Sequence, residues 1–92
     1  MNERIMTQHP AGKQGVNIDR DKYEKVREAI LETLKKVDDM PLHKLPPAVA
    51  KKLPDFDGSI SWYTTTIKLD LEARGLIERV PDSQPQRLRL IK

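Results

Sequence analysis

The chain has 92 residues, enough for one domain with a single hydrophobic core but too few for two. It contains no cysteine, which excludes disulfide bonds, thiolate catalysis and sulfur-bound metals. Its 34% charged residues leave a net charge of only +3, spread along the chain, so strong nonspecific binding to nucleic acid is not expected. The sequence has no apolar run of the length needed for a membrane span or a signal peptide, so we expect a cytoplasmic protein.

The N-terminal part, residues 1–16, shows no period in its few apolar positions, which predicts a flexible tail before a folded domain at residues 17–92. Asp19 is the predicted N-cap of the first helix, because its carboxylate can accept from free amides of the first turn. That helix is expected over residues 20–37. Its buried face is predicted from apolar spacings of three and four, at Tyr23, Val26, Ile30, Leu34 and Val37.

A short strand and a second helix are expected next. Pro41 favours an extended Met40, and Leu42 is expected to pair briefly with a later strand. A helix is predicted over residues 43–53, with Pro46 and Pro47 in its first turn, where proline is tolerated. Its apolar positions are Leu45, Val49, Ala50 and Leu53. A turn follows, in which Phe56 is expected to fill the core.

The third helix is predicted to begin at a cap formed by Asp57 or Ser59 and to stop at Arg74, because Gly75 can adopt a positive φ. One apolar stripe on it consists of Ile60, Tyr63, Ile67 and Leu71. A second stripe consists of Trp62, Leu69, Ala73 and Leu76. Two surfaces of this helix therefore need to be covered.

Residues 76–80 and 86–91 are compatible with β-strands, and the proline, aspartate and serine between them favour a turn. The two strands are expected to form an antiparallel hairpin. The order helix, short strand, helix, helix, strand, strand is that of an α+β winged helix-turn-helix domain, with three helices, a short strand after the first and a C-terminal hairpin wing.

Two resemblances accompany this fold. The segment LDLEARGLIER at residues 69–79 resembles the end of the third helix and the first wing strand of many bacterial winged-helix regulators, with the likeness carried by Leu71, Gly75, Leu76 and Ile77. The wider pattern resembles a family of small bacterial proteins of unknown function. It consists of GVNID at residues 15–19, PDFDGS at 54–59, SWY at 61–63 and PQRLRL at 85–90. Neither resemblance supplies catalytic or binding residues.

Winged-helix proteins commonly place the third helix in the major groove of DNA and the wing on the backbone, so double-stranded DNA is the first expected partner. The expected base-reading residues lie off the first apolar stripe of the third helix: Ser61, Thr64, Thr65 and Lys68. The expected phosphate contacts are the wing arginines Arg79, Arg87 and Arg89. Polar residues on a surface helix and arginines on an exposed strand are an alternative explanation for both sets.

The charge around the third helix counts against DNA. Residues 54–78 hold five acidic residues and two basic ones, whereas a major-groove reader usually carries more arginine. The alternative function is a protein-interaction module that uses the third helix without DNA, with a protein partner or a homodimer as its complex. Trp62 decides between them: if exposed it is a candidate anchor for a protein, and if buried it is part of the core.

An enzyme is not expected. His9 falls in the predicted tail, and His43 has no sequence neighbour that could complete a catalytic pair. Ser59 near Asp57 is better explained by helix capping than by nucleophilic catalysis. The sequence shows no phosphate-binding glycine loop and no metal-ligand spacing, so no catalytic residue, metal, cofactor, small-molecule substrate or membrane partner is predicted.

Overall fold

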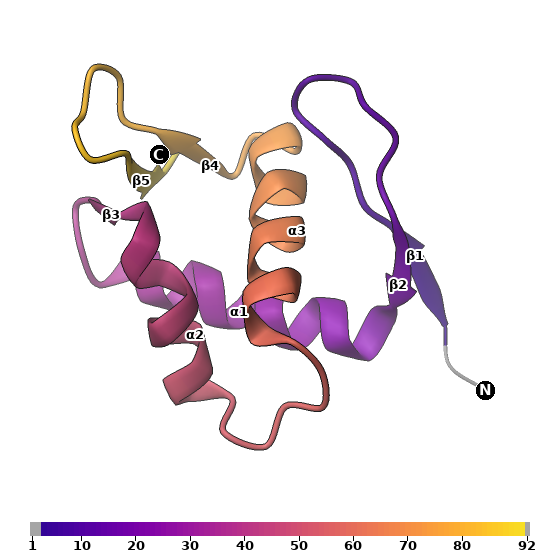
Figure 1. Cartoon of the computed structure of the whole chain (residues 1–92). Coiled ribbons are helices and arrows are strands. Elements are labelled where there is room, and N and C mark those ends of the chain that lie inside the picture. The colour runs from indigo at the N-terminus through magenta and orange to yellow at the C-terminus, as the bar shows by residue number, and fades with distance from the viewer. Residues whose placement is uncertain (1–2, 92) are drawn as a thin grey trace.

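The computed structural model describes residues 3–91, which form three α-helices and two small antiparallel sheets (Figure 1). The helices are α1 (Arg20–Lys35), α2 (Leu45–Lys52), preceded by a 3-10 turn at Leu42–Lys44, and α3 (Ile60–Ala73). The strands are β1 (Arg4–Met6), β2 (Asn17–Asp19), β3 (Met40–Pro41), β4 (Ile77–Arg79) and β5 (Arg87–Leu90). The predicted α+β class is therefore confirmed. Within residues 3–91, the helices lack the combined length and apolar character that a membrane crossing requires.

The hydrophobic core lies where the three helices meet, with α1 running behind α2 and α3 in Figure 1. The predicted faces of α1 and α2 are buried, as is the C-terminal half of the first stripe of α3, and β4 and β5 each contribute one residue. The fully buried apolar side chains are Val26, Ile30, Leu34, Leu45, Val49, Ile67, Leu71, Ile77 and Leu88. Val37, which was expected on the buried face of the first helix, is 43% exposed because α1 ends two residues earlier.

The predicted helix ends are also found. The Asp19 carboxylate accepts a hydrogen bond from the Lys22 amide at 3.1 Å, and the Ser59 hydroxyl oxygen accepts from the Trp62 amide at 3.2 Å. Ser59, and not Asp57, is thus the cap of α3. Gly75 has a φ of +77° directly after the last turn, a conformation that a Cβ atom disfavours.

The three-stranded sheet has the order β3-β5-β4 and joins the end of α1 to the C-terminal hairpin. Met40 lies opposite Leu88, and Ile77 lies opposite Leu90. The Leu42 amide donates to the carbonyl of Gln86 at 2.8 Å, so the short pairing expected after the first helix is present. The order of elements after Asp19 agrees with the predicted order.

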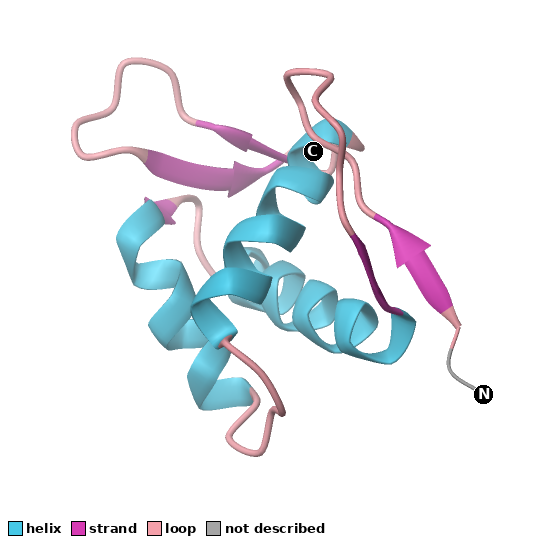
Figure 2. Cartoon of the chain, turned by 45° about the vertical axis from the view of Figure 1, so that its right-hand side comes forward, coloured by secondary structure: helices cyan, strands magenta, loops and turns pink. Residues whose placement is uncertain are grey.

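The N-terminal segment differs from the expected tail. β1 pairs with β2 in an antiparallel sheet with Ile5 opposite Ile18, and the Thr7 amide donates to the Val16 carbonyl at 2.8 Å. Figure 2 shows the loop between these strands rising beside the C-terminal end of α3. The pairing joins residues up to fifteen positions apart, so local periodicity does not reveal it. Met1 and Asn2, also assigned to the tail, lie outside the described residues.

Candidate functional site

The four predicted base-reading residues of α3 divide into two pairs. Ser61 and Thr65 are exposed, as expected. Thr64 and Lys68, by contrast, are only 1% and 4% exposed, which corrects the expectation that they lie on the free side of the helix. They share a face with the buried core residues Ile67 and Leu71, because positions three and four apart lie together on a helix. Neither is placed to read a base edge.

Lys68 is held by a carboxylate one helical turn away. Its Nζ donates to Oε1 of Glu72 at 3.2 Å, and the two side chains are 5% and 9% exposed. The same Oε1 atom accepts from Nε of Arg79 on β4 at 3.4 Å. A buried charge is tolerated when it is paired, so the ion pair with Glu72 explains how Lys68 fits among core residues.

Asp70 is the most buried charged residue of α3, with a side chain that is 0% exposed. Its carboxylate accepts from the hydroxyl of Tyr23 on α1, from Nε of Arg74 at 2.9 Å and from the amide of Gln8 at 2.8 Å. Gln8 belongs to the loop between β1 and β2. A single carboxylate therefore connects α1, α3 and the N-terminal strands.

The environment of Asp70 shifts the pKa values of its partners. Burial raises the pKa of Tyr23 to about 12, and the hydrogen bond to Asp70 adds to the shift because a phenolate would lose that bond and face a carboxylate. The hydrogen bond to Asp70 likewise raises the pKa of the Arg74 guanidinium. Tyr23 thus stays neutral at physiological pH, and the network carries one carboxylate and one guanidinium.

The charges of α3 are consequently hidden from solvent. Lys68, Asp70 and Glu72 are its charged residues, and each side chain is at least nine-tenths buried. The residues that α3 does expose are Ser61, Trp62 and Thr65, none of which is charged. Half-buried Leu69 continues this side of the helix at a spacing of four from Thr65. The surface that α3 presents is therefore uncharged.

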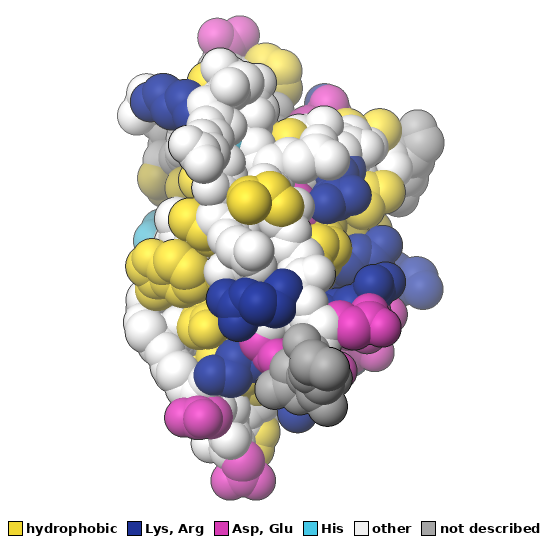
Figure 3. Space-filling view, turned by 90° about the vertical axis from the view of Figure 1, so that its right-hand side faces the viewer, with side chains coloured by type: hydrophobic (Ala, Val, Ile, Leu, Met, Phe, Trp, Pro, Cys, Tyr) yellow, Lys and Arg dark blue, Asp and Glu magenta, His cyan; other side chains and the backbone are white. Residues whose placement is uncertain are grey.

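The three hairpin arginines predicted as phosphate contacts are partly exposed, but each has a carboxylate partner. Arg79 contacts Glu72, the Nε of Arg87 donates to Asp39, and the Nε of Arg89 donates to Glu78 at 2.6 Å. A phosphate would have to compete with these carboxylates. Figure 3 shows the face on the side of β1 and β2, away from the hairpin, on which basic and acidic side chains also lie next to one another.

Trp62 is 46% exposed, which answers the question that the sequence left open: it is not part of the core. It packs edge-to-face against Tyr63, with ring centroids 4.9 Å apart, and Tyr63 packs in the same way against Phe56 at 5.1 Å. Nζ of Lys22 lies 5.7 Å from the centroid of the Tyr63 ring. We call Phe56, Trp62 and Tyr63 the aromatic cluster. This grouping was not predicted from the sequence. The signal that could have revealed it is the short turn before α3, which brings Phe56 back against Tyr63.

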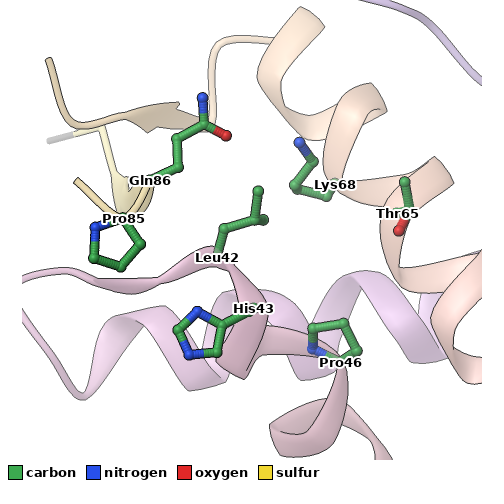
Figure 4. Close-up of a pocket in the computed structure, with 7 residues that line it drawn as sticks. All are labelled: Leu42, His43, Pro46, Thr65, Lys68, Pro85 and Gln86. Carbon is green, nitrogen blue, oxygen red and sulfur yellow. The ribbon is translucent and has the colours of Figure 1, made fainter. Parts of the chain in front are cut away.

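A pocket of about 430 Å³ opens between the start of α2, the middle of α3 and the C-terminal hairpin (Figure 4). It brings two of the predicted site residues, Thr65 and Lys68, together with Gln86 of the hairpin. Its complete lining is Leu42, His43, Pro46, Thr65, Lys68, Pro85 and Gln86. No sequence pattern predicted this pocket, because its walls come from three separate segments.

Across residues 3–91, no three His, Asp or Glu side chains come together in a way that would hold a metal ion. Comparisons with curated proteins and with solved structures found no match to the chain. The sequence model of a family of unknown function, DUF6958, matches residues 4–88, which include all three helices and both sheets almost to their ends. The chain therefore belongs to the DUF6958 family.

Proposed function

We propose that the chain is a cytoplasmic winged-helix domain that acts without catalysis, as a protein-interaction module using the exposed side of α3. The observation that carries this proposal is the contrast on α3 itself. Its charged side chains are at least nine-tenths buried, while its tryptophan is 46% exposed. Exposed tryptophan on an uncharged surface is a common anchor of protein interfaces, whereas phosphate binding requires accessible cations.

The aromatic cluster suits Trp62 to this role. The Trp62 ring is supported from one side by Tyr63, so its orientation is constrained before any partner binds. A side chain that is already ordered loses less entropy on binding than a mobile one. Ser61 and Thr65, which neighbour Trp62 on the helix, are small enough to let another helix approach closely.

The partner that fits this surface is a second copy of the chain. A two-fold interface places the same surface patch of both copies against each other, so a charged stripe would repel its copy, whereas the uncharged side of α3 does not. The 14 residues of α3 span roughly 21 Å, and at a helix width of about 10 Å one side of α3 offers roughly 200 Å², well below the ~800 Å² per partner of a typical stable interface. The proposed dimer is accordingly weak, with a dissociation constant on the order of micromolar to millimolar.

Sedimentation equilibrium over a wide range of protein concentrations tests this proposal, with Trp62→Ala as the variant. The matched control is Val37→Ala, which removes a side chain of similar exposure outside α3. Loss of the dimer in Trp62→Ala and its retention in Val37→Ala would support the proposal. A wild-type chain that stays monomeric at millimolar concentration, or a dimer unaffected by Trp62→Ala, would overturn it.

DNA binding is the second candidate function, favoured by one observation: Ser61 and Thr65 are both exposed on α3. Amide NMR titration with mixed-sequence duplex DNA at low and high salt separates the two functions. Shifts of Ser61, Thr65 and the β5 residues that shrink steeply with salt would replace the proposed protein contact with a DNA contact. Under our proposal none of these amides shifts on addition of DNA, and those of Ser61 and Thr65 shift as the protein concentration rises.

A further inference from the structure

We infer that the pocket between α2, α3 and the C-terminal hairpin binds a small organic monocarboxylate with an apolar body. Thr65 borders both this pocket and the proposed protein contact, but the inference does not depend on that contact, because the ligand's charge and amide contacts come from Lys68 and Gln86, which lie outside the exposed residues of α3. It rests on a buried ammonium group with spare donors, on the local charge, and on the chemistry of the pocket walls.

Lys68 lines the pocket, although its side chain is only 5% exposed. An ammonium group carries three N–H donors. Among residues 3–91, its side-chain hydrogen bond goes to a single acceptor, Oε1 of Glu72. Two donors thus remain available. Figure 4 shows Lys68 extending from α3 toward the hairpin, so that its amine lies on the same side of the pocket as the amide of Gln86.

The charge at this position favours a monoanion. Lys68 and Arg79 are both paired with the same carboxylate, that of Glu72, which leaves one positive charge in excess. A ligand with one negative charge balances the three groups. A phosphate dianion would leave an uncompensated negative charge beside apolar walls, which is unfavourable.

The apolar lining of the pocket is the reason for inferring a ligand with an apolar body. Leu42, Pro46 and Pro85 supply apolar surface, while the hydroxyl of Thr65 and the amide of Gln86 are available as hydrogen-bond donors (Figure 4). A volume of about 430 Å³ falls at the lower end of the range for small-molecule sites. Acids with a single ring or a short branched chain therefore match both the size and the polarity of the pocket.

Amide NMR titration with sodium benzoate tests this inference, with benzamide as an uncharged molecule of the same shape and sodium chloride as the salt control. We expect saturable shifts at Leu42, Lys68 and Gln86 with benzoate, and binding at least about tenfold weaker with benzamide. Lys68→Met keeps the aliphatic stem and removes the ammonium, so it should also weaken benzoate binding about tenfold or more.

A second variant covers the case in which Lys68→Met does not fold. Thr65→Val changes an exposed residue and removes one donor, so we expect a loss of a few-fold in benzoate affinity with the fold retained. Equal shifts with benzoate and benzamide, or benzoate affinity that is unchanged in both variants, would overturn the inference. The absence of saturable shifts at millimolar benzoate would overturn it as well.

Discussion

The hydroxyl of Tyr23 on α1 donates a hydrogen bond to the carboxylate of Asp70 on α3, in the interior of the domain. The two residues are 47 positions apart in the sequence. The same carboxylate accepts from Arg74 and from the amide of Gln8, so it holds two helices and the N-terminal strands together. Asp70 is therefore a structural residue whose partners come from three parts of the chain.

Replacing Asp70 with alanine should lower the free energy of unfolding by roughly 3–5 kcal/mol, because three buried or partly buried donors lose their acceptor. That is a large share of the stability of a domain of this size. Urea denaturation followed by circular dichroism measures the loss. Asp57→Ala is the matched control: its side chain is 98% exposed, and a change within about 0.5 kcal/mol is expected. Equal losses in the two variants would show that the Asp70 network contributes little.

Stability should fall at alkaline pH because of Tyr23. Its pKa is raised to about 12 in the folded chain, above the ordinary value of about 10, so folding favours the neutral phenol. This contribution is fully present below pH ~10 and is lost as the pH rises toward about 12. Tyr23→Phe cannot donate to Asp70, so it should be less stable than wild type at neutral pH. Because it has no phenol to titrate, the gap should narrow across this window. A gap that is constant from pH 9 to about 12 would contradict the shifted pKa.

Much of the fold could be predicted because its signals are local. The α1 face from Tyr23 to Leu34, the caps at Asp19 and Ser59, and the helix stop at Gly75 each depend on residues within a few positions of one another. The pairing of β1 with β2 depends on distant residues instead. Short strands such as Arg4–Met6 have too few residues to show an alternation, so the sequence predicts a tail in the N-terminal segment.

The candidate site was predicted less well because residue type and helical position disagree on α3. The sequence predicts Thr64 and Lys68 on the outside because they lie off the first apolar stripe and can form hydrogen bonds, whereas their spacing from Ile67 and Leu71 places them inside. Trp62 was open to either assignment and is exposed. The signal that could have corrected Lys68 is Glu72, four residues later, at the spacing of an intrahelical ion pair. The pocket had no comparable local signal.

The hairpin arginines are expected to act within the fold. Arg87 is paired with Asp39, which precedes β3, so the pair supports the docking of β5 on β3. Asp39→Asn should lower the free energy of unfolding by about 1 kcal/mol in urea denaturation, since the pair is only partly exposed. Glu78→Gln, which releases Arg89, should lower it by less, because that pair is more exposed. Both losses should shrink in 1 M salt, because ion pairs between partly exposed side chains are weakened by salt. A salt-dependent gain in duplex DNA affinity in either variant would instead assign the released arginine to phosphate binding.

The order of the N-terminal segment can be tested at Gly15. A Cβ atom at this position would lie 1.8 Å from the carbonyl oxygen of Thr7, and a backbone atom cannot move away as a side chain can. Gly15→Ala should therefore separate the two arms of the β1–β2 loop and break the hydrogen bond from the Thr7 amide to Val16. Because Gln8 follows Thr7, the contact with Asp70 should weaken too.

Hydrogen exchange of individual amides measures this effect. In the wild type the Thr7 and Gln8 amides should be protected, since they donate to Val16 and Asp70 at 2.8 Å each. In Gly15→Ala both should exchange much faster, while amides of α1 and α3 keep most of their protection because the helical core is intact. Gly12→Ala is the control in the same loop, where a Cβ meets no atom within 4 Å and the cost is limited to the positive φ of +76°. If Thr7 and Gln8 exchange freely already in the wild type, residues 3–16 are the flexible tail that local periodicity predicted, and Asp70 has lost one of its partners in solution.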